Sequence, residues 1–118
     1  MRGLTVSHVA MEQLIYSPGA PVVKITPKFL EIQIGQEGRF TCSVTGTPKP
    51  KVTWHKLDGL LPTHFVENGQ LILPKVRKID NGDYICRAVN NDGTDEDSAK
   101  LRTTGKSICH LLFLNFIL

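Results

Sequence analysis

The sequence has little of what enzymes and metal proteins need. Three cysteines and four histidines are spread over 118 residues. None of them stands at a C-x-x-C, H-x-x-x-H or H-E-x-x-H spacing, so a zinc site has no support. No G-x-G-x-x-G, Walker A or G-x-S-x-G motif is present either. These absences indicate a protein that is not an enzyme and that needs no metal or cofactor.

Charge and length narrow the function classes further. A formal net charge of +3 is too small to indicate nucleic-acid binding by itself. The length fits one domain, and a composition of 41% apolar and 21% charged residues is sufficient to build a core. We therefore expect one folded domain with no nucleic acid and no small-molecule substrate as its partner.

The two ends of the chain differ from its middle. Residues 1–20 contain only a weak apolar stretch, GLTVSHVAM, which Ser and His make a poor signal peptide. The tail ICHLLFLNFIL is apolar, but it is shorter than the stretch of about 20 residues that a spanning helix needs. A GPI signal would place its processing site near Ser98, inside a predicted strand. We expect an irregular segment (1–20), one domain (21–104) and an apolar tail (105–118).

Three interpretations of these ends stay open. Both ends can be by-products of a fragment, a splice form or a gene model. The tail can instead be a truncated membrane segment, or it can pack on the domain. Contact with a membrane is expected only if the tail is real and exposed.

The middle of the chain has the pattern of an all-β protein. Short alternating runs recur between turn signals, and they are VVKIT, ended by Pro27, then FLEIQI, RFTCSV, KVTWHK, QLIL, DYICRAVN and SAKLRT. NNDG is expected to form a hairpin turn. TDED (94–97) is expected at the solvated hairpin tip, because it lacks the spaced ligands of a calcium loop. Many short strands without helices predict a sandwich or a barrel.

Cys86 is by its residue type a candidate nucleophile, metal ligand or disulfide partner. Alternation places Cys86 on the inward face of its run, as it does Cys42 and Trp54 in theirs. The spacing of Cys42, Trp54 and Cys86 is that of an immunoglobulin domain. Tyr84, two residues before Cys86, fits the tyrosine corner of that fold.

The sequence resembles the intermediate-set (I-set) immunoglobulin family. The matching positions run through most of the domain: Gly46-x-Pro48-x-Pro50-x-Val52-x-Trp54, then Leu71-x-Leu73-x-x-Val76-x-x-x-Asp80-x-Gly82-x-Tyr84-x-Cys86-x-Ala88-x-Asn90-x-x-Gly93. The stretch between Trp54 and Leu71 is too short for the extra strands of a variable domain. The pieces LPT and GQLILPKV are most similar to repeats of perlecan-type matrix proteoglycans and of cell-adhesion proteins.

The resemblance implies an all-β, two-sheet antiparallel immunoglobulin-like β-sandwich of the I-set. It implies a disulfide between Cys42 and Cys86, with Cys109 left free. It also implies a set of core signature residues, which are Trp54, Leu73, Asp80, Gly82 and Tyr84. In this set the Tyr84 hydroxyl is expected to form a hydrogen bond with the backbone near Asp80. A disulfide indicates an oxidising compartment, so the location implied is extracellular, in a secreted matrix or at the cell surface.

The function implied is that of a binding and spacing module in an extracellular matrix or cell-adhesion protein. The alternative is an I-set module of an intracellular muscle scaffold, similar to titin, whose cysteines stay reduced. The complete Cys-Trp-Cys set favours the first interpretation.

Alternation also predicts a candidate binding face, because side chains switch faces at every residue of a strand. Its outward residues are Lys51, His55, Ile85, Arg87, Val89, Lys100 and Arg102. We expect a basic face with an apolar centre, opposite a neutral to acidic sheet that shows Glu31, Gln33, Thr41, Ser43 and Ile72. The basic face either only keeps the sheet soluble or contacts another protein or an anionic glycan such as heparan sulfate. A second basic cluster consists of Lys75, Arg77 and Lys78.

Overall fold

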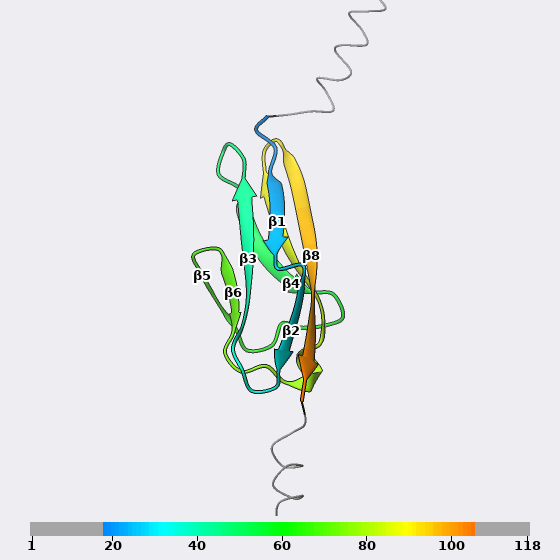
Figure 1. Ribbon diagram of the computed structural model, residues 1–118. Helices are drawn as coiled ribbons and strands as arrows, with labels where there is room; N and C mark the ends of the chain where they lie inside the picture. The colour runs from blue at the N-terminus through cyan, green and yellow to red at the C-terminus, as the bar shows by residue number, and fades with distance from the viewer. Residues whose placement is uncertain (1–17, 106–118) are drawn as a thin grey trace, which may run out of the picture.

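The computed structural model describes residues 18–105 of the chain. These residues form eight β-strands and one short 3-10 helix, shown in Figure 1, and no α-helix. The elements in chain order are β1 (Val22–Thr26), β2 (Phe29–Gln33), β3 (Gly38–Thr45), β4 (Lys51–Lys56), β5 (Phe65–Glu67), β6 (Gln70–Leu73), η1 (Lys78–Asp80), β7 (Gly82–Asn90) and β8 (Gly93–Thr104). The predicted all-β class is confirmed.

The strands form two four-stranded sheets, ordered β1-β3-β6-β5 and β2-β8-β7-β4. Neighbours run antiparallel except β2 and β8, which run parallel. Figure 1 shows the two sheets packed as layers, with β1 beginning at one end of the sandwich and β8 ending at the other. This is the predicted two-sheet sandwich.

The first extended segment changes sheets at Pro27. Before it, β1 pairs with β3, and after it, β2 pairs with β8. Proline has no N–H to give to a ladder, which suits the crossing point between two sheets. The prediction that Glu31 and Gln33 face out from the opposite sheet is wrong, because β2 lies beside β8. Alternation shows which residues share a face of a strand, but not which sheet the strand joins.

The core lies between the sheets. A disulfide with an S–S distance of 2.04 Å joins Cys42 of β3 to Cys86 of β7, so the predicted bridge is confirmed. Around it the rings of Phe40 and Tyr84 lie 5.5 Å apart, and Trp54 is almost fully buried. Removing each large apolar side chain from water contributes about 1.5–3 kcal/mol, so these groups form the main stabilising cluster.

Ile72 is fully buried, so its predicted exposure is wrong, although it alternates with the core residues Leu71 and Leu73 and so lies on the outer face. Strand β6 lies between β3 and β5, and the register places Arg39 and Phe65 on either side of Ile72. A side chain on the outer face of a central strand is covered by such neighbours, which alternation along one strand does not show.

Two strands differ from their predicted extents. Strand β5 was not predicted, although Asn68 and Gly69, with φ of 51° and 76°, form the Asn-Gly turn that is a strong hairpin signal. Strand β8 begins at Gly93 rather than Ser98. The pair Asn90–Gly93 closes a tight turn, so TDED lies within β8 and its placement at a solvated tip is wrong.

No helix among residues 18–105 is long and apolar enough to cross a membrane. The predictions made for residues 1–17, for Cys109 and for the apolar tail beyond residue 105 fall outside the described residues.

Candidate functional site

Tyr84 and Cys86, the two residues that sequence reasoning singled out first, both have structural roles. The Tyr84 hydroxyl donates to the Asp80 backbone oxygen at 2.6 Å. Burial, together with the carboxylates of Asp80 and Asp58, raises the pKa of Tyr84 well above its usual value. The hydroxyl therefore stays protonated and keeps its donor role. Cys86 is fully buried and bridged, so it offers no thiolate for catalysis or metal binding.

The turn before β7 contains Arg77, a member of the second basic cluster predicted from the sequence. Asp80 is buried, and its carboxylate accepts from the Arg77 backbone N–H at 2.8 Å and from Arg77 Nη2 at 3.3 Å. A buried carboxylate needs such donors to offset its loss of hydration. Arg77 is therefore partly committed to this turn, which weakens the second basic cluster as a free anion site.

The seven residues of the candidate binding face lie on the outer side of β4, β7 and β8. The register places Lys51 opposite Val89, and His55 opposite Ile85. Cys86, Ala88, Ala99 and Leu101 are buried on the other side of the same strands. This arrangement brings the seven side chains onto one surface without showing what that surface binds.

The charge predicted for this face is wrong. Lys100 Nζ lies 3.7 Å from Asp83 Oδ1, and Arg102 Nε lies 3.9 Å from Glu31 Oε2. Arg87 lies opposite Glu96 in the β7–β8 register. Each exposed pair contributes only about 0–1 kcal/mol to stability, but together the acids cancel most of the basic charge. The prediction failed for two reasons: β2 and the first half of β8, which carry Glu31 and Glu96, were not placed on this sheet, and Asp83 of β7 was left out of the face.

Apolar surface remains between these pairs. Val89 is 41% exposed and Leu57 is 66% exposed, whereas Ile85 is only partly exposed. A shallow hollow on this side is bordered by Leu57, Asp83, Ile85, Glu96, Asp97 and Ser98. Apolar spots surrounded by paired charges are typical of the surface that contacts another protein.

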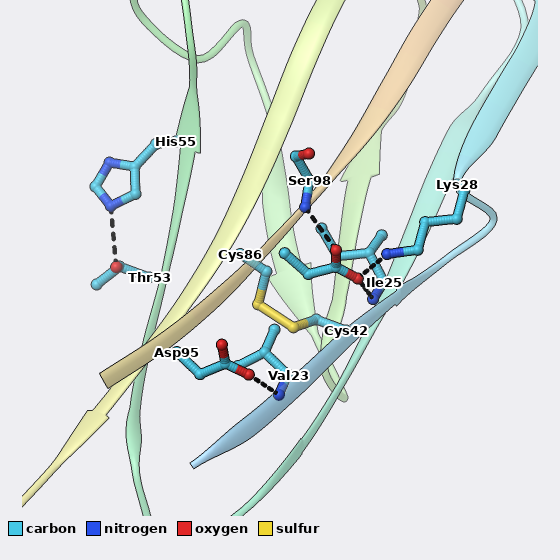
Figure 2. The surroundings of a disulfide bond; sticks show 10 residues. Val23, Ile25, Lys28, Cys42, Thr53, His55, Cys86, Asp95 and Ser98 are labelled. Carbon is cyan, nitrogen blue, oxygen red and sulfur yellow. Dashed lines mark hydrogen bonds and ion pairs between the residues drawn. A yellow bond between two sulfur atoms is a disulfide. The ribbon is translucent and has the colours of Figure 1, made fainter. Parts of the chain in front are cut away.

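Asp95 and Asp97 bind backbone amides at the edge of β1, and Figure 2 shows the contact between Asp95 and Val23. Val23 N–H donates to Asp95 Oδ2 at 2.8 Å, and Ile25 N–H donates to Asp97 Oδ2 at 2.8 Å. Asp97 also accepts from Lys28 Nζ. An edge strand exposes backbone N–H and C=O groups that have no partner strand. The two carboxylates accept from two such N–H groups of β1.

The surroundings of Asp97 set its charge state. Burial alone raises the pKa of a carboxyl group, but the Lys28 ammonium and the backbone amides of Ile25 and Ser98 outweigh it and hold the pKa of Asp97 below its usual value. The carboxylate is therefore ionised at neutral pH. Within residues 18–105 no group of three or more His, Cys, Asp and Glu side chains is arranged to hold a metal ion.

Comparisons with known proteins agree with this architecture. The family model of the immunoglobulin I-set domain matches residues 21–103. The basement membrane-specific heparan sulfate proteoglycan core protein of Mus musculus is 37% identical over 86 residues, which cover 72% of this chain and 2% of that protein. Smooth muscle myosin light chain kinase of Gallus gallus is 29% identical over 117 residues, covering 89% of this chain and 6% of the kinase.

Solved structures give the same fold. The tandem Ig repeats of Dlar match with a TM-score of 0.67 and 27% identity, over 76% of this chain and 51% of that one. The chain spans only a few per cent of the curated relatives named above, so it corresponds to one module of each. I-set domains are typically non-catalytic modules that contact other proteins. On the match over residues 21–103 and the identity to matrix relatives, this chain belongs to the immunoglobulin I-set family.

Proposed function

We propose that the chain is a binding and spacing module of an extracellular matrix or cell-adhesion protein. The observation that carries this proposal is the disulfide between Cys42 and Cys86, which joins the two sheets through the core. Disulfides persist in oxidising compartments and are rare in the cytosol. Similarity to a basement-membrane proteoglycan core protein supports the same location.

The geometry suits a spacer. Strand β1 begins at one end of the sandwich and β8 ends at the other (Figure 1), so consecutive modules would extend a chain rather than fold it back. The bridged cysteines are 44 residues apart, and closing such a loop removes about 4 kcal/mol of unfolded-state entropy in the chain-entropy model. Small domains have a total stability of about 5–15 kcal/mol, so the bridge would stabilise the module considerably.

The partner proposed for the candidate binding face is another protein. A heparan sulfate site would need several cations free to meet sulfate groups. Lys100 and Arg102 instead lie near Asp83 and Glu31, and Glu96 lies opposite Arg87. The exposed Val89 and Leu57 add the apolar area that protein contacts use.

A second function has a specific observation behind it. The match to smooth muscle myosin light chain kinase extends over 117 residues, more of this chain than the match to the proteoglycan covers. In that case the module would belong to an intracellular muscle scaffold, and both cysteines would be reduced. The two proposals therefore differ in one chemical property, the oxidation state of Cys42 and Cys86.

Differential thiol labelling distinguishes them. The protein is isolated from its native source in an alkylating buffer that traps free thiols at once, and is then digested without reduction. We expect a cross-linked pair of peptides that contain Cys42 and Cys86, without alkyl groups. Alkylation of both cysteines before any reductant is added would reject the extracellular proposal and support the muscle module. Chain made in an oxidising secretory host serves as the bridged standard.

A further inference from the structure

The two long flanks of the sandwich are protected differently. On one flank, Asp95 and Asp97 bind the edge amides of β1. On the other flank, β4 ends one sheet and β5 ends the other, and no further strand pairs with either of them among the described residues. Unpaired strand edges are templates for another strand unless they are blocked. Two edge amides of β1 are thus satisfied by side chains, whereas no side chain is seen to bind the edge amides of β4 or β5 among the described residues.

A groove lies between these two edges. Its volume is about 470 Å³, and its lining is mainly apolar, with Val44, Val52, Trp54, Leu61 and Val66 among the residues that form it. Val52 of β4 is 40% exposed and Val66 of β5 is 54% exposed. The buried indole N–H of Trp54 has no hydrogen-bond acceptor within residues 18–105. The groove thus combines exposed apolar side chains with an unpaired donor and unpaired strand backbone.

The titratable residues that line this groove are all basic. Lys49 and His64 line it, and no Asp or Glu does. Strand β4 carries Lys51 and Lys56 at its ends. Lys56 is occupied by Asp58 at 2.5 Å, but no ion pair engages Lys49 or Lys51 among the described residues. An occupant with acidic groups at its ends would match these free cations.

We propose that the β4–β5 flank binds an extended acidic and apolar segment of a partner polypeptide, which adds as a strand to β4. Strand addition takes its affinity from backbone hydrogen bonds and its specificity from pockets for alternate side chains. Strand β4 has six residues and β5 only three. Because Lys56 at the end of β4 already forms a bridge with Gly59, the template is residues 51–55 of β4. Alternate apolar side chains of the segment would enter the groove beside Val52 and Val66. This site shares Lys51 with the outer face proposed above to contact a protein, but its groove lies on the flank rather than on that face, and it extends the function of the module.

The test uses the full chain labelled with nitrogen-15 and a synthetic peptide of alternating valine and threonine with a glutamate at each end. We expect shifts in the amides of β4 and β5 and in the indole N–H of Trp54, the one tryptophan of the chain. A peptide with proline at its centre should not bind, because proline cannot donate to a ladder. A peptide with lysine at each end should bind less tightly.

Two matched variants locate the site. Val66→Lys should weaken binding about tenfold or more, since a buried valine contributes roughly that much to affinity. Val22→Lys changes a valine that is 61% exposed on β1, and it should leave binding unchanged. The amide spectrum of each variant shows whether it folds.

Several outcomes would overturn the proposal. They are absence of any shift at millimolar peptide, shifts confined to β1 or to the outer face of β7 and β8, and equal binding of the proline peptide. Shifts at β4 that depend on protein concentration without peptide would show a second copy of the chain as the occupant, which would also reject a partner segment.

Discussion

Replacing Asp97 by asparagine tests whether carboxylates hold the first strand in place. Asp97 Oδ2 accepts from Ile25 N–H at 2.8 Å, Oδ1 accepts from Ser98 N–H at 3.0 Å, and Lys28 Nζ binds the same carboxylate. The side chain of Asp97 is only 22% exposed. Asparagine has nearly the same shape and keeps one acceptor oxygen, but it loses the charge. We therefore expect β1 to stay in place on average and to be held less strongly.

The magnitude follows from the contacts. A hydrogen bond to a charged group contributes about 1.5–3 kcal/mol, compared with about 0.5–1.5 kcal/mol for a neutral one. The exposed pair with Lys28 adds about 0–1 kcal/mol. The substitution should therefore lower the free energy of unfolding by about 1–3 kcal/mol in total. In a domain of this size each 1 kcal/mol lowers Tm by roughly 4–8 °C.

The same contact predicts a pH dependence with a definite sign. The pKa of Asp97 is lowered in the folded protein, whereas an unfolded Asp has a pKa of about 3.9. A group with a lowered folded-state pKa stabilises the fold above its unfolded pKa, and this contribution is lost as pH falls through the folded value. The difference between wild type and Asp97→Asn should therefore be full at neutral pH and should close in acid.

Urea unfolding of the full chain at neutral and acid pH, with hydrogen exchange of the Ile25 amide, measures both effects. Glu96→Gln is the matched control, because it removes the same charge from the adjacent residue, which lies opposite Arg87 on the outer face. That control should change stability by no more than about 0.5 kcal/mol. The reasoning fails if Glu96→Gln costs as much as Asp97→Asn, or if the Ile25 amide exchanges at the same rate in wild type and Asp97→Asn.

Trp54→Ala should lower the free energy of unfolding by about 3–5 kcal/mol, because it leaves a cavity beside the disulfide. Tyr84→Phe should cost less, about 1–3 kcal/mol, by leaving the buried Asp80 oxygen without its donor; urea denaturation that reverses this order would contradict it. Arg87→Glu combined with Arg102→Glu should abolish binding to a candidate adhesion protein, which a direct binding assay against wild type measures. Binding that survives this change but is lost on reversing Lys75, Arg77 and Lys78 would place the site at the turn before β7.

The sequence was sufficient for the fold because its signals are local and agree with one another. Alternation placed Phe40, Cys42 and Tyr84 inward, and Pro27 marked the end of the first strand. The pairing of Cys42 with Cys86 needed the family resemblance, because spacing alone leaves the chemistry of a cysteine open. These signals depend on side-chain direction within a single strand, which the period of two fixes.

The charge of the candidate face was not predictable in the same way, because it depends on neighbours across strands. Glu31 meets Arg102 only after β2 joins β8 in parallel, and Ile72 is covered only because β6 lies between two strands. The open flank was also missed. Its strand β5 has three residues, and the Asn68–Gly69 turn was the one signal that could have predicted it.

The three consecutive acidic residues of β8 have different roles because their side chains point to two sides of the strand. In sequence, Asp95, Glu96 and Asp97 form a single block of negative charge. In the strand, alternate side chains point to opposite sides, so Asp95 and Asp97 bind the amides of β1 while Glu96 lies opposite Arg87. The same three residues therefore satisfy two edge amides of β1 and reduce the net positive charge of the outer face. The two surfaces that we propose for specific contact are the apolar part of that face and the β4–β5 groove, and no acidic residue lines the groove.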